Sequence, residues 1–88
     1  MDIAIVGGGI SGLAAAWELS ADPKLDITVH EASDRLGGKI STSMFAGRNV
    51  DEGPDAFLRR VPDALRLCEE IGLDDLVSPA HGTACIWL

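Results

Sequence analysis

The chain opens on Ile3-Ala4-Ile5-Val6-Gly7-Gly8-Gly9-Ile10-Ser11-Gly12-Leu13, and an acidic residue, Glu31, follows the last of these glycines by 19 positions. An apolar strand, a glycine-rich turn, the start of a helix and a later acid together form a dinucleotide-binding fingerprint. Gly7 permits the sharp turn from strand to helix, Gly9 lets the backbone approach a pyrophosphate, and Gly12 lets the helix pack closely on the strand. The sequence therefore predicts a nucleotide site at this turn.

The helix start and Glu31 complete the predicted site. Backbone N–H groups at the start of a helix have no intrahelical partner and carry a partial positive charge, so they favour a bound phosphate. Glu31, at the end of a second strand, can accept hydrogen bonds from ribose hydroxyls. A strand-to-helix turn without a ligand is the alternative, because glycine-rich turns of this kind are common and only their context makes them specific.

The hydrophobic pattern predicts an α/β fold that begins with a Rossmann-like βαβ unit. Asp2–Val6 is short and rich in apolar residues, as a buried parallel strand is. A helix is expected over Ile10–Ser20, ended by Asp22-Pro23 because proline cannot continue a helix. Leu25–His30 is the second strand. The residues at helical spacing on the predicted apolar face are Ile10, Leu13, Ala14, Trp17 and Ala21.

The middle of the chain predicts a loop and then a hairpin. Ser33–Lys39 is polar and contains a pair of glycines, as a loop does. Thr42–Phe45 and Arg48–Asp51 can pair as two strands around Ala46-Gly47. Turn chemistry follows the second of these strands, at Gly53-Pro54-Asp55.

A second helix is expected over Pro62–Ile71, because proline suits the first helical position. Gly72 should cap its C-terminus, with Leu73 folding back onto it. We expect one short turn over Asp74–Val77 and an apolar strand over Thr83–Leu88. The apolar face of this helix is predicted to hold Val61, Leu65, Cys68 and either Ile71 or Gly72.

The composition argues against several classes of function. Fourteen acidic residues against seven basic ones give a net charge of −7 and a pI of about 4.5. A nucleic-acid partner needs a basic stripe, so we expect none. No apolar run approaches the 18 or so residues of a membrane span, and Asp2 stands where a signal peptide has basic residues. We therefore predict a cytoplasmic protein without a transmembrane segment.

The chain is apolar for its length, with 47% hydrophobic residues and a mean hydropathy of +0.19 over 88 residues. Such a composition suits part of a larger protein, whose apolar faces meet partners elsewhere. Cys68 and Cys85 lack the spacing of metal ligands, so we predict buried free thiols and no metal site.

A second motif, Arg35-Leu36-Gly37-Gly38-Lys39, follows Glu31 by four positions. An NAD dehydrogenase domain, which Glu31 would suit equally well, leaves this second glycine pair unexplained. FAD is longer, and a second close backbone approach beside its phosphates and ribityl chain is useful. Arg35 and Lys39 add positive charge near an anionic cofactor. The sequence therefore favours FAD, with an ordinary polar loop as the alternative.

These motifs resemble a known family. Gly7–Gly12, Glu31-Ala32 and Arg35–Lys39 are similar to the N-terminus of the flavoprotein group that contains amine oxidases, phytoene desaturases and protoporphyrinogen oxidases. Two later stretches, Val50–Leu58 and Pro62–Leu73, resemble the segment that passes the flavin and the helix after it in protoporphyrinogen and coproporphyrinogen oxidases. The resemblance covers the whole chain.

The resemblance implies a role for each matching position. The glycine turn would contact the FAD pyrophosphate, and Glu31 and Ala32 would lie at the adenosine end. Asp55 departs from the mitochondrial type, which has a basic residue there, and resembles the Gram-positive branch that favours coproporphyrinogen III. The implied cofactor-binding residues are Gly7, Gly8, Gly9, Ile10, Ser11, Gly12, Glu31, Ala32, Arg35, Gly38, Lys39, Gly53, Pro54, Asp55 and Ala56.

The implied reaction is the oxidation of a porphyrinogen to a porphyrin, in which six electrons leave in three hydride-type steps to FAD and O2 reoxidises the flavin. Nothing in the chain identifies a catalytic residue: no Ser/His/Asp or Cys/His set is present, and His30 and His81 are expected to be structural or solvated. Asp51, Glu52 and Asp55 form an acidic cluster that we interpret first as turn chemistry and second as a contact to substrate or flavin.

Two other functions stay open. An amine oxidase or a phytoene desaturase would share the first motifs but not the Pro62–Leu73 stretch. The chain can also be a non-catalytic nucleotide-binding fragment, because in this family a substrate domain and a C-terminal FAD motif complete a two-domain protein. We expect the 88 residues to be the incomplete N-terminal part of the FAD-binding domain, with no oxidase turnover and weak nucleotide binding of their own.

Overall fold

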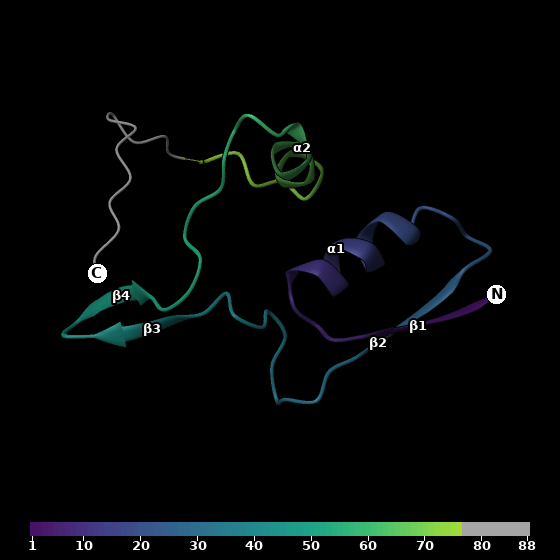
Figure 1. Ribbon diagram of the computed structural model, residues 1–88, viewed down its shortest axis with the longest axis horizontal. Helices are drawn as coiled ribbons and strands as arrows, with labels where there is room; N and C mark the ends of the chain where they lie inside the picture. Colours follow the sequence, from purple (N-terminus) through teal and green to yellow (C-terminus); the bar gives the residue numbers. More distant parts are fainter. Residues whose placement is uncertain (77–88) are drawn as a thin grey trace. The chain divides into compact units, whose positions relative to one another are not determined.

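The computed structural model describes residues 1–76, which fall into two units, Met1–Phe57 and a second that begins at Leu58. The elements follow the order β1, α1, β2, β3, β4 and α2 (Figure 1). The predicted strand over Thr83–Leu88 and the residues His81 and Cys85 lie outside the described part of the chain.

The first three elements form the predicted βαβ unit. β1 (Asp2–Val6) and β2 (Asp26–His30) pair in parallel, with Asp2 opposite Asp26 and Val6 opposite His30. α1 (Ile10–Leu19) connects them and packs along the pair (Figure 1). It ends one residue before the predicted boundary: the N–H of Ser20 still bonds the carbonyl of Ala16, whereas those of Ala21 and Asp22 bond carbonyls three residues back, at Glu18 and Leu19.

The two strands are covered on one face only. Ile3 and Ile5 of β1 are half-buried, whereas Val6 is 89% exposed. The same alternation runs along β2, as expected when successive side chains point to opposite faces of a sheet. The prediction that Asp2–Val6 is a buried strand therefore holds for one face only within the described residues, because a single helix can cover only one side of the pair.

The buried face of α1 differs from the predicted one. Leu13 and Ala14 are half-buried as expected, whereas Ile10 is 55% and Trp17 45% exposed. The half-buried residues of the helix are Gly12, Leu13, Ala14, Ala16 and Leu19. Small residues dominate this face, so the helix lies close to the strands and the larger side chains at its edges extend past them.

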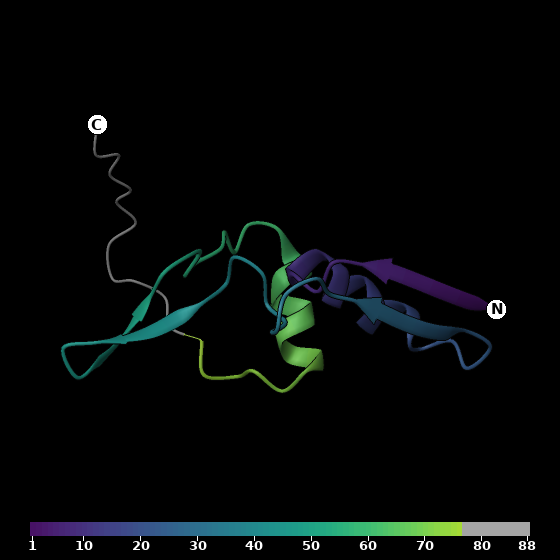
Figure 2. The same cartoon turned by 90° about the horizontal axis from the view of Figure 1, so that it is seen from below.

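The hairpin forms as predicted. β3 (Thr42–Phe45) and β4 (Arg48–Asp51) pair antiparallel, with Phe45 opposite Arg48 (Figure 2). The two turn residues have positive φ, +49° at Ala46 and +77° at Gly47. A two-residue turn with both φ angles positive is a type I′ turn, whose twist matches that of paired strands.

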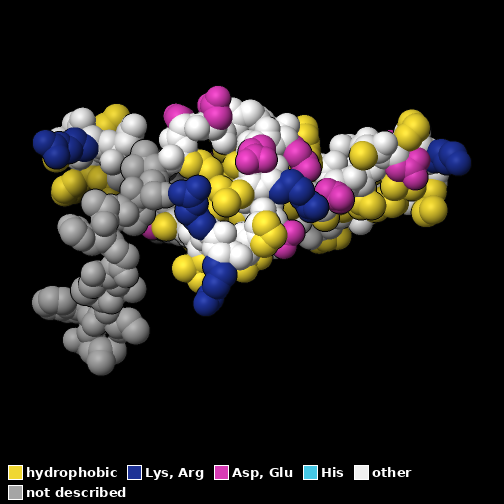
Figure 3. Space-filling view, turned by 90° about the horizontal axis from the view of Figure 1, so that it is seen from above, with side chains coloured by type: hydrophobic (Ala, Val, Ile, Leu, Met, Phe, Trp, Pro, Cys, Tyr) yellow, Lys and Arg dark blue, Asp and Glu magenta, His cyan; other side chains and the backbone are white. Residues whose placement is uncertain are grey.

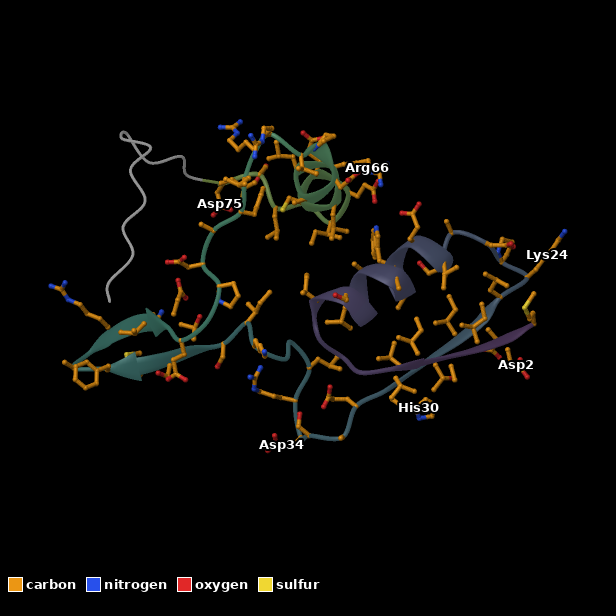
Figure 4. The ribbon with its side chains drawn as sticks, in the orientation of Figure 1. Asp2, Lys24, His30, Asp34, Arg66 and Asp75 are labelled. Carbon is orange, nitrogen blue, oxygen red and sulfur yellow. The ribbon has the colours of Figure 1, made fainter. Side chains whose placement is uncertain are left out.

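α2 (Pro62–Glu70) is the helix of the second unit. The N–H of Leu73 bonds the carbonyl of Cys68, and that of Gly72, at φ +83°, bonds the carbonyl of Glu69. These two bonds form a Schellman cap and confirm the predicted cap at Gly72, while the helix itself ends at Glu70, one residue before the predicted boundary. Arg66, labelled in Figure 4, lies 4.0 Å from Asp63 and 3.8 Å from Glu70 in solvent-exposed ion pairs along α2.

Two details of this unit differ from prediction. The half-buried residues of α2 are Ala64, Leu65, Leu67 and Cys68, while Val61 and Ile71 are about half exposed. Residues 74–76 form no turn, so that part of the predicted Asp74–Val77 turn is wrong, and Val77 lies outside the described residues. Cys68 is a free, half-buried thiol, as predicted apart from its partial exposure.

The described surface is mixed in chemistry. Figure 3 shows hydrophobic side chains interspersed with charged ones, and no hydrophobic side chain among residues 1–76 is fully buried. Neither α1 nor α2 has the length and apolarity that crossing a membrane requires.

Candidate functional site

The glycine turn between β1 and α1 has two glycines that the protein itself requires. Gly7 has φ +103°, a backbone conformation that residues with a side chain rarely adopt. Its N–H donates to the carbonyl of His30 at 2.7 Å. A Cβ on Gly12 would overlap the carbonyl oxygen of Gly7. The turn conformation therefore excludes a side chain at both positions.

Gly9 is different. Its φ of −78° and ψ of −174° are open to any residue. A Cβ there would meet only the Cα of Gly38, at the ordinary distance of 3.9 Å. The packing of the protein itself therefore does not require glycine at position 9, although the dinucleotide-binding fingerprint does.

The start of α1 is electrostatically suited to an anion. The first intrahelical bond runs from Leu13 N–H to the carbonyl of Gly9, at 3.0 Å, so the N–H groups of Ile10, Ser11 and Gly12 precede it. No side chain caps this end and its first turn has no acidic residue. An anion at this end would face the positive end of the helix dipole, and the first turn of α1 itself contributes no carboxylate.

Glu31 reaches back from the end of β2 to the glycine turn. One carboxylate oxygen accepts the N–H of Gly8 at 2.9 Å, and the other accepts the N–H of Ser33 at 2.7 Å. The Ser33 bond first and the Gly8 bond second hold the pKa of Glu31 below its ordinary value of 4.5. The carboxylate is therefore ionised at neutral pH, and each oxygen has lone pairs left for a further donor.

Gly8 is the one buried residue among those that the structure describes. A Cβ there would overlap the side chain of Leu36 and come within 3.3 Å of the Glu31 carboxylate. Neither Leu36 nor Ser33 was among the predicted site residues. Ser33 could be anticipated, since a short polar residue after a strand often bonds nearby backbone, but no sequence signal identifies Leu36 as the cover of Gly8.

The second glycine motif packs directly on the first. The N–H of Gly37 bonds the carbonyl of Gly8 at 2.8 Å, and Gly37 pairs with Gly9 in a single parallel bridge. A Cβ on Gly38 would lie only 3.1 Å from the Cα of Gly9. The structure thus brings together, backbone to backbone, two motifs that are separate in the sequence.

The basic residues of this loop differ in their surroundings. The Arg35 guanidinium donates to three carbonyls of its own loop, those of Leu36, Gly38 and Ile40. Lys39 has an exposed side chain. Figure 4 shows His30 at the end of β2 and Asp34 on the stretch that leads into this loop.

The third predicted segment meets the loop through its glycine. A Cβ on Gly53 would overlap the carbonyl oxygen of Lys39, and the N–H of Glu52 bonds the carbonyl of Ser41 at 2.8 Å. Asp51 accepts a bond of 2.8 Å from the Thr42 hydroxyl across the hairpin, which favours the structural interpretation of this acid. The predicted site residues with exposed side chains outside these contacts are Ile10, Ser11, Ala32, Pro54, Asp55 and Ala56.

Residues 10–87 match the family model described as flavin containing amine oxidoreductase. The chain belongs to this family. The family resemblance predicted from the motifs is confirmed, and membership indicates a flavin cofactor. Among residues 1–76, no group of three or more His, Cys, Asp or Glu side chains is placed to hold a metal ion.

Several proteins similar to this chain are named as porphyrinogen oxidases. The coproporphyrinogen III oxidase of Propionibacterium freudenreichii is 44% identical over 91% of this chain and 15% of its own length, and that of Bacillus subtilis is 42% identical over 85% and 17%. A crystal structure from Exiguobacterium, provisionally assigned as a protoporphyrinogen oxidase, superposes with a TM-score of 0.73 and 46% identity over 82% of this chain and 16% of that one. The chain therefore spans about a sixth of the length of these relatives.

Proposed function

We propose that this chain binds FAD, through the Gly7–Gly12 turn and the Arg35–Lys39 loop, as the N-terminal part of the FAD-binding domain of an oxygen-dependent porphyrinogen oxidase. The observation that carries the proposal is the geometry of Gly9. Gly7 and Gly12 are needed by the turn itself, whereas Gly9 has room for a side chain and an ordinary backbone. A pyrophosphate that approaches the backbone supplies the missing reason for glycine there.

The proposed roles follow from where the residues lie. The first-turn N–H groups of α1 would hold the pyrophosphate, since their positive end is uncapped. Glu31 would accept the adenosine ribose hydroxyls with the lone pairs that Gly8 and Ser33 leave. In the proposed site Ala32 flanks the adenosine, Arg35, Gly38 and Lys39 lie along the cofactor, and the flavin ring region is lined by Gly53, Pro54, Asp55 and Ala56.

The proposed substrate is a porphyrinogen, because relatives 39–44% identical to this chain are named coproporphyrinogen III oxidases and a plant relative, 41% identical, is named protoporphyrinogen oxidase 2. Bound FAD supplies the hydride acceptor, which O2 reoxidises, while the protein positions the cofactor and excludes water. Asp55 favours coproporphyrinogen III over protoporphyrinogen IX within this proposal. An amine or carotenoid substrate is less favoured by these names.

The activity is proposed for a protein longer than these 88 residues. The flavin-contacting motif expected near the C-terminus and the substrate domain would both lie outside them. We therefore expect no turnover of coproporphyrinogen III by the isolated chain in an aerobic assay that follows porphyrin fluorescence. Turnover above the rate without protein would contradict the proposal that essential parts of the active site lie outside these 88 residues.

The nucleotide proposal is tested by titrating the 88-residue chain with FAD, following flavin fluorescence, with NAD as competitor. We expect saturable FAD binding that equimolar NAD does not displace. Gly9→Ser should weaken FAD binding at least tenfold, while folding is kept because serine is a good N-cap. Ala15→Ser, on the exposed face of α1, is the matched control. Displacement by NAD, or unchanged affinity in Gly9→Ser, would refute the proposal.

A further inference from the structure

Arg35 uses its side chain inside its own loop. Its guanidinium donates to the carbonyl of Gly38 at 2.6 Å, to that of Leu36 at 3.1 Å and to that of Ile40 at 3.4 Å. Its main chain is held as well, because the Ser33 hydroxyl bonds the carbonyl of Arg35 at 2.9 Å. The Arg35 guanidinium thus binds every second carbonyl of the five-residue stretch 36–40.

This stretch needs such a partner. Gly37 at φ +109° and Gly38 at φ +59° are both in conformations that glycine reaches freely but does not prefer over others. A guanidinium presents five N–H donors in a planar fork, so it can hold several carbonyls in one arrangement, which a single ammonium does less well. A Cβ on Gly37 would lie 3.2 Å from an Arg35 nitrogen, so the loop is shaped closely around this side chain.

The stretch that Arg35 shapes is the one that meets the glycine turn. Gly37 bonds the carbonyl of Gly8 at 2.8 Å, and Gly38 lies against the Cα of Gly9. A change in the loop backbone would therefore move the surface at which the turn and the loop touch. This turn is also the place where the proposed function puts the pyrophosphate.

We propose that Arg35 is a positioning residue: by holding the carbonyls of Leu36, Gly38 and Ile40, its guanidinium fixes the loop against the Gly8–Gly9 turn, and it supports FAD binding through this backbone rather than as a phosphate ligand. The consequence for FAD rests on the proposed function. The effect on the loop does not, so the two can be tested separately.

The first test follows amide hydrogen exchange by NMR in the 88-residue chain without FAD. We expect the amides of Gly37 and Ile40, which report the docking and the internal shape of the loop, to exchange at least tenfold faster in both Arg35→Lys and Arg35→Gln. The Gly7 amide, bonded to β2, should keep its rate. Arg48→Gln, on the exposed strand β4, is the control and should change none of the three.

The second test compares FAD affinity in the same variants at several NaCl concentrations. A phosphate ligand would be largely rescued by lysine, which keeps the charge, whereas a positioning role predicts that lysine and glutamine weaken FAD binding by a similar factor of roughly ten. The salt dependence of the remaining affinity should match that of the unmodified chain. Lys39→Gln should instead make FAD affinity less dependent on salt, because it removes a solvent-exposed charge whose attraction to FAD is screened by salt.

Each outcome decides the proposal. Rescue by Arg35→Lys alone, or wild-type exchange of Gly37 and Ile40 in both variants, would overturn it, as would unprotected Gly37 and Ile40 amides in the unmodified chain. If the unmodified chain binds no FAD, the proposed nucleotide function fails for this chain, and the exchange rates alone decide whether Arg35 positions the loop.

Discussion

Two glycines of the same motif differ in whether the fold tolerates a side chain in their place. Gly12 cannot carry a Cβ without overlap with the Gly7 carbonyl, whereas Gly9 can. We expect Gly12→Ala to lower the free energy of unfolding by about 1–3 kcal/mol, the range for overpacked sites. Gly9→Ala should lower it by at most about 1 kcal/mol, the size of an N-cap effect. Urea unfolding followed by circular dichroism measures both, and equal losses would contradict the different roles.

Glu31 links acid stability to the glycine turn. Its bonds to Ser33 and Gly8 lower its pKa in the folded chain below 4.5, so they stabilise the fold at pH values above the unfolded pKa and this contribution is lost as pH falls through the folded pKa. In Glu31→Gln, the free energy of unfolding should therefore decrease less steeply than in the unmodified chain as the pH is lowered from about 5. Glu18→Gln, on the exposed side of α1, should follow the unmodified chain. An unchanged acid branch in Glu31→Gln would show that these bonds do not form.

At the scale of elements, the β3–β4 hairpin has a suboptimal turn residue. Ala46 adopts φ +49°, a left-handed conformation that costs a residue with a Cβ roughly 1–2 kcal/mol and that asparagine tolerates better. Ala46→Asn should therefore stabilise the hairpin by about 0.5–1 kcal/mol. Slower amide exchange across β3 and β4 would show this, and Ala46→Val should have the opposite effect. Faster exchange in the asparagine variant would mean that the turn is not type I′.

The elements could be predicted because their signals are local. The bounds of β1, the hairpin and the Gly72 cap follow from strand patterns, an Ala-Gly pair and a glycine after a helix. The absence of a turn at residues 74–76 shows the limit, since an isolated helical turn fixes several residues for one hydrogen bond and no paired strands support it here, as they do at Ala46-Gly47. No sequence pattern determined that Leu36 covers Gly8, because that contact depends on how distant segments meet. The bonds of Arg35 are local, but they depend on the positive φ angles of Gly37 and Gly38, which the sequence does not specify.

At the scale of the molecule, burial could not be predicted from pattern alone. Strand alternation identifies two faces, but which face is covered depends on the elements that are present. In the described residues α1 covers Ile3 and Ile5, and Val6 on the other face is 89% exposed. The contacts between the three glycine segments are therefore made by backbone rather than by a side-chain core, since no hydrophobic side chain among residues 1–76 is fully buried.

This one-sided burial predicts unequal effects of two threonine substitutions in β1. Val6→Thr exchanges a methyl group for a hydroxyl at a site already in contact with water, so it should change the free energy of unfolding of the 88-residue chain by less than about 0.5 kcal/mol. Ile5→Thr removes apolar area that α1 partly covers, and it should cost about 1 kcal/mol or more. Both variants keep a β-branched side chain, so strand propensity is matched. Urea unfolding measures the difference, and a larger loss at Val6 would mean that the exposed face of the sheet is covered in solution.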